Sequence, residues 1–282
     1  MTANVVRPEI VRRQVTINFD DLPPAPWRTG AALELWLKAG SLIFPRGERF
    51  FIDAVRAWRE SVTDPVLLEQ IGDFIHQEAM HSKIHSDCNA ALARDNSQCL
   101  RVVRWCDKAF VVFDRAPRGL KLTVSTAIEH FTAIASDTAF RNQDDFRQST
   151  PAAFVDMWLW HAAEETEHKA VCFEVHRTVF GRGLYGYLHR IGGMLLATPM
   201  FLGGILAAGA FLYFGRRRTA VPQKPSNPDS QFQTRNMFVL MGRLVRWRLY
   251  FDYFRPSFEP WKHDNSHFVR EWRARYPGFG EA

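Results

Sequence analysis

The sequence predicts an all-helical protein, and three observations support that fold class. Proline marks the expected starts of four helices, since its missing N–H and fixed φ suit the first helical position. After each of these prolines, apolar residues recur at intervals of three and four rather than two. No stretch alternates apolar and polar residues between hairpin turns, so we expect no β-sheet. The four starts are Phe44-Pro45, Asp64-Pro65, Ala116-Pro117 and Thr150-Pro151.

Four long helices follow from these starts, with expected ranges of 45–61, 65–94, 117–141 and 151–179. Gly181 and Gly183 are expected to end the fourth, because glycine readily adopts the left-handed conformation that closes helices. The connector between the second and third helices, CLRVVRWCDKAFVVF, has a helical pattern of its own. Such a connector is typical of a crossover that lets its two neighbours run parallel in a four-helix bundle.

Composition favours a globular protein with one large domain and extensions. The chain has 282 residues, of which 46% are hydrophobic and 13% aromatic, which excludes a disordered chain. A net charge of +6 suits nucleic acid, an anionic membrane or an acidic partner. The arginines cluster beside apolar segments without an aromatic nucleic-acid motif, so we expect no nucleic acid. Four cysteines without a Cys-x-x-Cys pair, and no cleavable signal, indicate a reducing cytoplasmic setting.

An uncharged segment over residues 191–214 is expected to associate with a membrane. As a helix, its roughly 24 residues would reach about 36 Å, enough to cross a bilayer. Three arginines at 216–218 follow it, and the positive-inside rule assigns them to the cytoplasmic side together with the preceding bundle. Three arrangements stay open: a span, a re-entrant hairpin broken near Pro199 or 203–204, and a helix buried in protein. The expected location is the inner face of the cytoplasmic membrane.

The sequence divides into four expected parts. Residues 219–230 form a linker rich in Pro, Ser and Asn. After it, QFQTRNMFVLMGRLVRWRLYFDYF mixes apolar, aromatic and arginine residues, as expected of a helix at a membrane interface or of an ordinary surface helix. The parts are an N-terminal arm (1–29), a helical bundle (30–184), an apolar membrane-associated segment (185–218) and a basic, aromatic C-terminal extension (219–282), which includes an amphipathic helix.

The stretch WLWHAAEETEHKAVCFE, residues 158–174, concentrates histidine and glutamate in the fourth helix. His161, Glu165 and His168 share one helix face, whereas Glu164 lies at its edge and Glu167 points away. The alternative, a helix whose charged residues face water, is disfavoured by the apolar residues around the cluster. These are Trp158, Trp160, Val171 and Phe173.

The other three helices carry matching residues. In the second, FIHQEAMHSKIH aligns Glu78, His81 and His85 on one face. The first supplies Glu48 in FPRGERFF, and the third supplies Glu129 in STAIEHFT. Each of the four helices therefore offers an inward carboxylate. Small residues around Glu129 leave room for a substrate.

One Glu from each of two helices, with a Glu-x-x-His from each of the other two, resembles the ferritin-like carboxylate bundles that hold two metal ions. His161 also resembles the additional histidine of the diiron N-oxygenases that oxidise aryl amines. His85 is interpreted either as a ligand or as a residue that supports one from behind, and Glu164 and His130 as supporting or structural residues. The expected metal ligands are Glu48, Glu78, His81, Glu129, His161, Glu165 and His168, with the four glutamates as the catalytic set.

As a whole, the chain resembles a bacterial family of predicted metal-dependent hydrolases placed among the ferritin-like proteins. The resemblance covers roughly residues 10–265, and it implies a ferritin-like four-helix bundle with a dinuclear metal site. The motifs that carry it are FPRGERFF, HQEAMHSKIH, AIEHFT, WHAAEETEHKAVCFE and YFRPSFEPW.

The choice of ligands leads us to expect a dinuclear non-haem metal enzyme with two iron ions, an oxidase or oxygenase that activates O2 on a small apolar or amphipathic substrate. A membrane surface, an electron donor and a second copy in a homodimer are the expected partners. The alternative is a two-metal hydrolase, favoured by manganese or zinc instead of iron, in which a bridging hydroxide attacks an ester, amide or phosphate. A second alternative is a non-enzymatic ferritin-like metal-binding protein.

Overall fold

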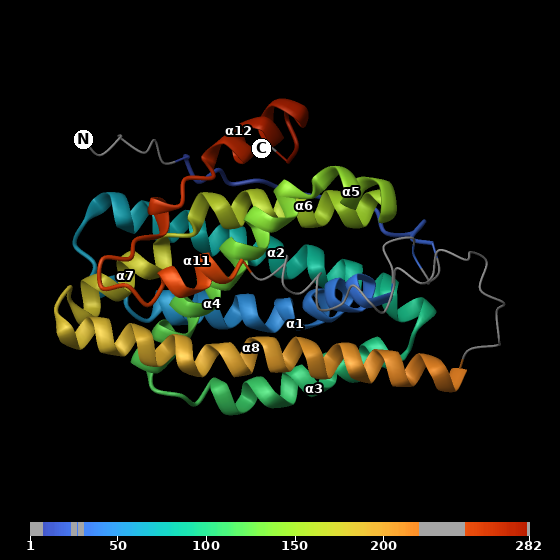
Figure 1. Ribbon diagram of the computed structural model, residues 1–282, viewed down its shortest axis with the longest axis horizontal. Helices are drawn as coiled ribbons and strands as arrows, with labels where there is room; N and C mark the ends of the chain where they lie inside the picture. Colours follow the sequence, from blue (N-terminus) through green and yellow to red (C-terminus); the bar gives the residue numbers. More distant parts are fainter. Residues whose placement is uncertain (1–7, 24–26, 28–30, 220–245, 281–282) are drawn as a thin grey trace.

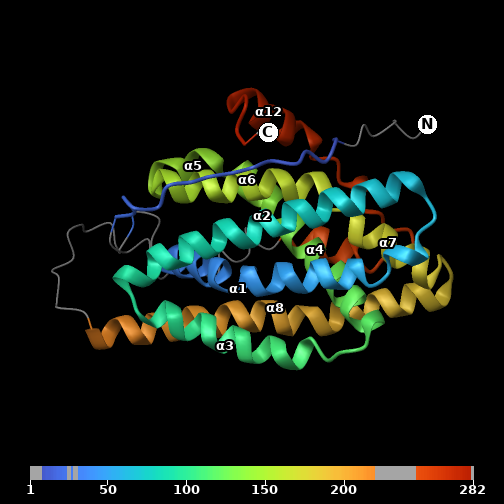
Figure 2. The same cartoon turned by 180° about the vertical axis from the view of Figure 1, so that it is seen from behind.

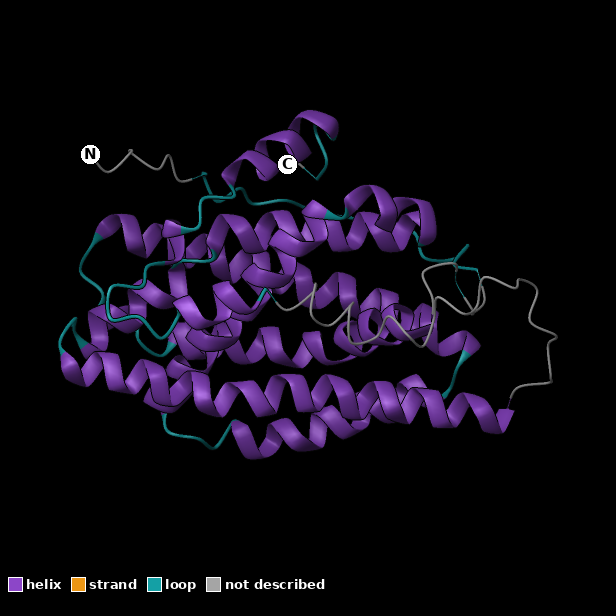
Figure 3. Cartoon of the chain, in the orientation of Figure 1, coloured by secondary structure: helices purple, strands orange, loops and turns teal. Residues whose placement is uncertain are grey.

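The computed structural model describes residues 8–23, 27, 31–219 and 246–280. Helix makes up 78% of the structure, and no strand occurs in these described ranges (Figure 3). The predicted all-α class is therefore confirmed. The long helices are α1 (Ala31–Arg56), α2 (Pro65–Asp95), α3 (Gln98–Phe113), α4 (Arg118–Arg141), α6 (Ala152–His168), α7 (Val171–Phe180) and α8 (Leu184–Thr219). The short ones are η1 (Arg59–Ser61), α5 (Gln143–Ser149), α11 (Trp247–Asp252), η3 (Pro260–Lys262) and α12 (Ser266–Arg275).

Helices α1, α2, α4 and α6 form the central bundle (Figure 1, Figure 2). Helix α1 packs on α2 and α4, and α6 packs on both α4 and α2. In Figure 1, α2 and α4 run in the same direction. Helix α3, which connects them in the chain, runs back in the opposite direction along the outside of the bundle. The predicted helical connector is thus α3.

Three of the four predicted helix starts agree closely with the structure. Helix α2 begins at Pro65, and the side chain of Asp64 accepts a hydrogen bond from the backbone N–H of Val66 (2.9 Å). Helices α4 and α6 begin directly after Pro117 and Pro151, respectively. Proline therefore marks the start of three of the four helices that carry the predicted ligands.

The predicted start at Pro45 is wrong, because α1 begins at Ala31 and continues through this proline. Proline has no N–H to give to the carbonyl four residues earlier, which belongs to Ser41. That carbonyl instead accepts a hydrogen bond from Nδ2 of Asn89 on α2 (2.8 Å). A partner from the neighbouring helix thus takes the place of the missing bond and ties α1 to α2.

The predicted fourth helix is divided into α6 and α7 at Lys169 and Ala170. Helical hydrogen bonding between residues four apart resumes at Ala170, whose carbonyl accepts from the N–H of Glu174 (2.9 Å). Gly181 ends α7 with a φ of 77°, as predicted from the preference of glycine for this conformation.

Helix α8 runs without interruption through Pro199 and residues 203–204, so the re-entrant hairpin expected there is wrong. It packs along α1 and α4, and at Gly193 the helices approach so closely that a Cβ would lie 2.8 Å from the carbonyl oxygen of Thr123. Within this chain, 22% of its most apolar 18-residue window is buried. By length and composition α8 could cross a membrane.

The two ends of the described chain lie against the bundle. The N-terminal segment and α12 both run over α6 (Figure 1, Figure 2). Of the predicted C-terminal amphipathic helix, residues 231–245 lie outside the described residues, as does most of the predicted linker, and the described remainder is α11. Both terminal segments matter for the site, because they contribute an arginine each to its surroundings.

Candidate metal centre

A polar layer divides the hydrophobic core into two clusters. On α1, Leu42 belongs to one cluster and Phe50 to the other; on α2, Ile84 and Phe74 are divided in the same way. The motif glutamates of α1 and α2 lie between these positions. A polar layer inside a core is stable only if its groups are paired with one another or with an ion.

All four predicted carboxylates are in this layer and are almost completely buried. Glu48, Glu78, Glu129 and Glu165 are 2%, 0%, 1% and 2% exposed, respectively. The structure also brings His81, His161 and His168 to the same layer, each at most 3% exposed. Seven residues predicted from local spacing on four helices therefore meet at one place.

His168 faces three of the carboxylates. Its Nε2 lies 3.2 Å from Oε1 of Glu78, 3.5 Å from Oε2 of Glu129 and 3.5 Å from Oε2 of Glu165. His81 directs its Nδ1 toward the same group, 3.7 Å from Oε1 of Glu165. One imidazole thus approaches the carboxylates from α6 and the other from α2.

The donor atoms fall into groups of three that could each hold a metal ion. Within each group, all donor atoms lie within 4.8 Å of one another. The groups are Glu78, Glu165 and His168; Glu48, Glu78 and His81; His81, His161 and Glu165; and Glu48, His85 and His161. Glu129 adds a further oxygen next to His168.

The cluster lacks the hydrogen bonds that buried polar groups require. Within the described part of the chain, neither carboxylate oxygen of Glu48, Glu78 or Glu129 has a hydrogen-bond partner, and the same holds for Nε2 of His168. A buried group left unpaired costs about 1–3 kcal/mol, and native proteins tolerate few of them. Two divalent cations would pair with these atoms and balance the charge of four carboxylates. The residues therefore fit a pair of metal ions.

The pKa values of the carboxylates also show that the cluster is unfavourable without cations. Burial, followed by the neighbouring carboxylates, raises the pKa of Glu48 and Glu129 well above the usual range. Burial also raises the pKa of Glu78 to about 7. Burial alone would raise the pKa of Glu165, but the charge of His168 and the contacts with both histidines lower it. Without cations, protons must take their place among the carboxylates.

Hydrogen bonds behind the cluster fix the direction of His168. Gln77 donates through Nε2 to the carbonyl of Val11 (3.0 Å) and to Oε2 of Glu167 (2.7 Å), so its Oε1 is an acceptor. It therefore accepts the N–H at Nδ1 of His168 (2.8 Å). The lone pair of a neutral His168 is then at Nε2, the atom that faces the carboxylates.

A buried carboxylate lies behind His81, close to its ring but without a hydrogen bond to it. Oε2 of Glu164 lies 3.1 Å from Nε2 of His81, on the side away from the cluster. The other oxygen of Glu164 accepts from Nη1 of Arg13 (2.9 Å), and Nη2 of Arg13 donates to Glu167 (2.7 Å). Arg273 of α12 also donates to Glu167 (2.8 Å). Both terminal segments thus hold the layer that lies behind the two histidines.

A third chain of hydrogen bonds leads to His161. Nδ2 of Asn89 donates to the Ser41 carbonyl, so its Oδ1 must accept the hydroxyl proton of Ser41 (2.8 Å). The hydroxyl oxygen then accepts from Nδ1 of His85 (2.9 Å), and Nε2 of His85 accepts from Nδ1 of His161 (2.8 Å). This leaves Nε2 of His161 without a proton, 2.9 Å from Oε1 of Glu165. Two lone pairs cannot face each other at that distance unless a cation or a proton lies between them.

Sequence reasoning missed several of these supporting residues. Arg13 and Ser41 lie outside the motifs, and Gln77 lies within HQEAMHSKIH but was given no role. The buried Glu167 was expected to point away from the cluster, as it does, but its partners were not predicted. The signal for a buried partner of Glu167 in the sequence was that Glu164, Glu165 and Glu167 lie close together among the apolar residues of this helix. A buried glutamate outside the ligand face requires a cation, and that cation is Arg13.

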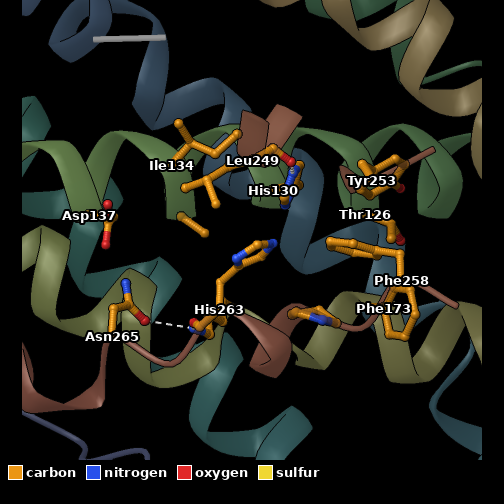
Figure 4. Close-up of a pocket in the computed structure, with 13 residues that line it drawn as sticks. Thr126, His130, Ile134, Asp137, Phe173, Leu249, Tyr253, Phe258, His263 and Asn265 are labelled. Carbon is orange, nitrogen blue, oxygen red and sulfur yellow. Dashed lines mark hydrogen bonds between the residues drawn. The ribbon is translucent and has the colours of Figure 1, made fainter. Parts of the chain in front are cut away.

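A small cavity of about 30 Å³ lies between α4, the turn after α6 and the C-terminal segment (Figure 4). His263 points toward its middle, between His130 and Asn265 in the view of Figure 4. Nε2 of His130 bonds to the Leu249 carbonyl (2.9 Å), in line with its expected structural role. Lys169, the residue after His168, donates to the His263 carbonyl (2.8 Å), and burial lowers its pKa to about 7. The cavity is large enough for about one water molecule.

Comparison with protein-family models gives a match over residues 11–264 to a family described as "Predicted metal-dependent hydrolase". Neither the curated proteins nor the solved structures give a match. The family resemblance drawn from the motifs is therefore confirmed, whereas the ferritin-like assignment stays a prediction.

The match corrects the leading functional expectation. The ligand types predict an oxidase or oxygenase that activates O2, but the family is described by hydrolysis, so the oxygenase interpretation is wrong and the hydrolase alternative agrees better. The physical reason is that carboxylate and imidazole ligands serve redox-active and redox-inert metals equally well. The ligand set alone therefore does not select the reaction.

Proposed function

Because this chain belongs to the family of predicted metal-dependent hydrolases, we propose that it is an enzyme that uses two metal ions to hydrolyse a small apolar or amphipathic substrate. The observation that carries the proposal is the buried layer of four carboxylates and three imidazoles, most of whose facing atoms lack protein partners. The unpartnered atoms are both oxygens of Glu48, Glu78 and Glu129, Oε2 of Glu165, Nδ1 of His81 and Nε2 of His168. Such a layer is costly in a core unless cations occupy it.

The proposed ligands are the residues whose donor atoms converge. Glu48, Glu78, Glu129 and Glu165 would supply oxygens, and His81, His161 and His168 would supply nitrogens. This division, with one carboxylate from each of four helices, is the basis for proposing a ferritin-like bundle over residues 30–184. Oxygen and imidazole donors suit iron, manganese and zinc.

When bound, the two cations would polarise the substrate's carbonyl or phosphoryl group and lower the pKa of a water molecule. The chain contributes the conditions for that chemistry. Gln77 holds the imidazole ring of His168 from behind by a hydrogen bond, and the carboxylate of Glu164 lies behind that of His81. The apolar clusters on either side of the layer exclude bulk water, which strengthens each charge interaction inside it.

The choice of substrate class rests on the surroundings of α4. Phe173, Leu249 and Phe258 form apolar walls of the cavity, and Lys169 and His263 add polar groups. An amphipathic ester, amide or phosphate ester would match this mixture of apolar and polar groups. The cavity is too small for such a molecule in its present shape, so α11 and the segment up to Asn265 would have to move outward on binding.

The proposal is tested by metal loading and a substrate panel. Metal-free protein is reloaded with Mn²⁺, Zn²⁺ or, without oxygen, Fe²⁺, and hydrolysis of p-nitrophenyl esters, anilides and phosphate esters is measured. Two metal ions per chain, with hydrolysis lost in Glu165→Ala, support the proposal. The matched control is Glu174→Ala, which removes a partly exposed carboxylate whose partner is Arg177 (3.0 Å). Two metal ions without hydrolysis of any class would reject the hydrolase, and no metal in either protein would reject the site.

A further inference from the structure

Helix α8 presents an apolar face that packs against no other described element. Its inner side lies on α1 and α4, where Met194, Ala197 and Leu212 are fully or almost fully buried. The outer side carries large apolar residues that are between 44% and 68% exposed. These are Tyr185, Leu188, Leu195, Leu206, Phe211 and Phe214.

The exposed residues form one continuous stripe. At 100° per residue, all six lie within one half of the helix circumference, opposite Met194, Ala197 and Leu212. From Tyr185 to Phe214 the stripe would be about 44 Å long at 1.5 Å per residue. No charged residue occurs between Ile191 and Gly215. A contiguous apolar surface of this length marks an interaction site in a stable protein.

Helix α3 lies beside α8 and adds positive charge to the same region (Figure 1, Figure 2). Arg101, Arg104 and Lys108 are exposed on one side of α3, interleaved with the exposed side chains of Trp105 and Val112. The acidic residue of this helix, Asp107, already lies 3.6 Å from Arg46. Basic side chains that alternate with tryptophan and aliphatic residues are typical of helices at an anionic lipid surface.

We propose that α8 and α3 form a docking surface for an anionic phospholipid bilayer, with α8 lying in the plane of the membrane. The apolar stripe would enter the boundary between headgroups and acyl chains, while the α3 row would contact lipid phosphates. This inference does not depend on the proposed reaction.

Two other arrangements agree less well with the contacts. If α8 crossed the bilayer, α1 and α4 would be drawn into hydrocarbon with it, together with their buried carboxylates Glu48 and Glu129. If a second copy covered the stripe across a two-fold axis, the same apolar and basic face would meet itself. The α3 arginines would then find no acidic partner.

Vesicle binding tests the surface on the full-length, metal-loaded protein. We expect sedimentation with vesicles that contain phosphatidylglycerol, and weaker binding to pure phosphatidylcholine. Leu195→Glu with Leu206→Glu should abolish binding to both, whereas Val66→Glu, at a 59% exposed site on α2, should leave it unchanged. Neutralising Arg101, Arg104 and Lys108 to Gln should weaken binding to anionic vesicles by about fivefold per charge. Wild-type protein that ignores both vesicles, or a stripe variant that binds like wild type, would overturn the proposal.

The orientation is tested separately by spin-label depth. Labels at Leu188→Cys, Leu195→Cys and Phe211→Cys sample the stripe, and the four native cysteines are buried and so protected from labelling. In-plane docking predicts similar, shallow depths of about 5–10 Å for all three labels. A central label much deeper than the outer two would mean a span and would overturn the proposal. A detergent-free dimer that the Leu195→Glu, Leu206→Glu variant dissociates, without any vesicle binding, would also overturn it in favour of a second copy.

Discussion

Replacing Ser41 by alanine should weaken metal binding although Ser41 is not a proposed ligand. The Ser41 hydroxyl donates to Asn89, so its oxygen can only accept from Nδ1 of His85. Nε2 of His85 is then the acceptor for Nδ1 of His161. Without the hydroxyl, Nδ1 of His85 loses its acceptor, and His85 can adopt the other tautomer. Its Nε2 would then donate to His161, which would place a proton on the nitrogen that faces Glu165.

The size of the effect can be estimated in two ways. A residue that orients a metal ligand typically contributes 10- to 100-fold in affinity, which is about 1.4–2.8 kcal/mol. A buried N–H left without an acceptor costs about 1–3 kcal/mol, and both Ser41 and His85 are fully buried. The two estimates agree, so we expect the dissociation constant of one of the two metal ions to rise by about one to two orders of magnitude.

The assay is titration of metal-free protein with Co²⁺, followed by visible absorption and by competition with a chelator. Ser86→Ala is the matched control, because its hydroxyl donates only to the Ser82 carbonyl of the same helix (2.7 Å). Ser41→Thr keeps a hydroxyl and should recover most of the affinity. If Ser41→Ala binds both Co²⁺ ions with wild-type affinity and spectrum, His161 is not oriented by this chain and the reasoning is refuted.

Three further outcomes follow from the same structure. Arg13→Met leaves Glu164 buried without its cation and Glu167 with Arg273 alone, so the free energy of unfolding measured in urea should fall by about 3–5 kcal/mol; a loss below about 1 kcal/mol would contradict this. Since burial raises the pKa of Glu78 to about 7, a metal ion must displace its proton, and affinity should fall as the pH is lowered through 7. Calorimetry near pH 6 in buffers of different ionisation enthalpy should detect proton release, and its absence would argue against Glu78 as a ligand. Pro45→Ala restores an N–H that competes with Asn89 for the Ser41 carbonyl, so the metal-free protein should become more stable to urea, by up to about 3 kcal/mol, while metal affinity falls; tighter metal binding would contradict it.

The parts of the fold that sequence predicted correctly are those set by local signals. Asp64 and Pro65 define the start of α2 because one caps the helix and the other fits its first turn. Pro45 looks the same in sequence, yet it lies inside α1, because Asn89 from another helix satisfies the carbonyl that it leaves free. A tertiary contact decides between these outcomes, and no local pattern records it.

The candidate site divides along the same line. His161, Glu165 and His168 were predictable because spacing on one helix puts them on one face. The groups that orient them were not, because Arg13 and Glu167 are 154 positions apart and Gln77 and His168 are 91 apart. The reaction type was not predictable either, since it depends on the metal and on the shape of the approach rather than on the ligand types.

The arrangement of these distant contacts suggests why the terminal segments are part of the site. The four ligand helices alone would leave Glu164 and Glu167 buried beside the cluster, which would add two more negative charges to a layer that already holds four carboxylates. Arg13 and Arg273 balance that charge from the outside, so the inner layer is left for the metal ions. Burial raises the pKa of Glu164 to about 8, although the charge of Arg13 opposes the shift. The N-terminal segment therefore acts on the metal centre through charge, without supplying a ligand. A chain that lacks residues 1–13, and with them Arg13, should lose metal affinity even if the bundle still folds.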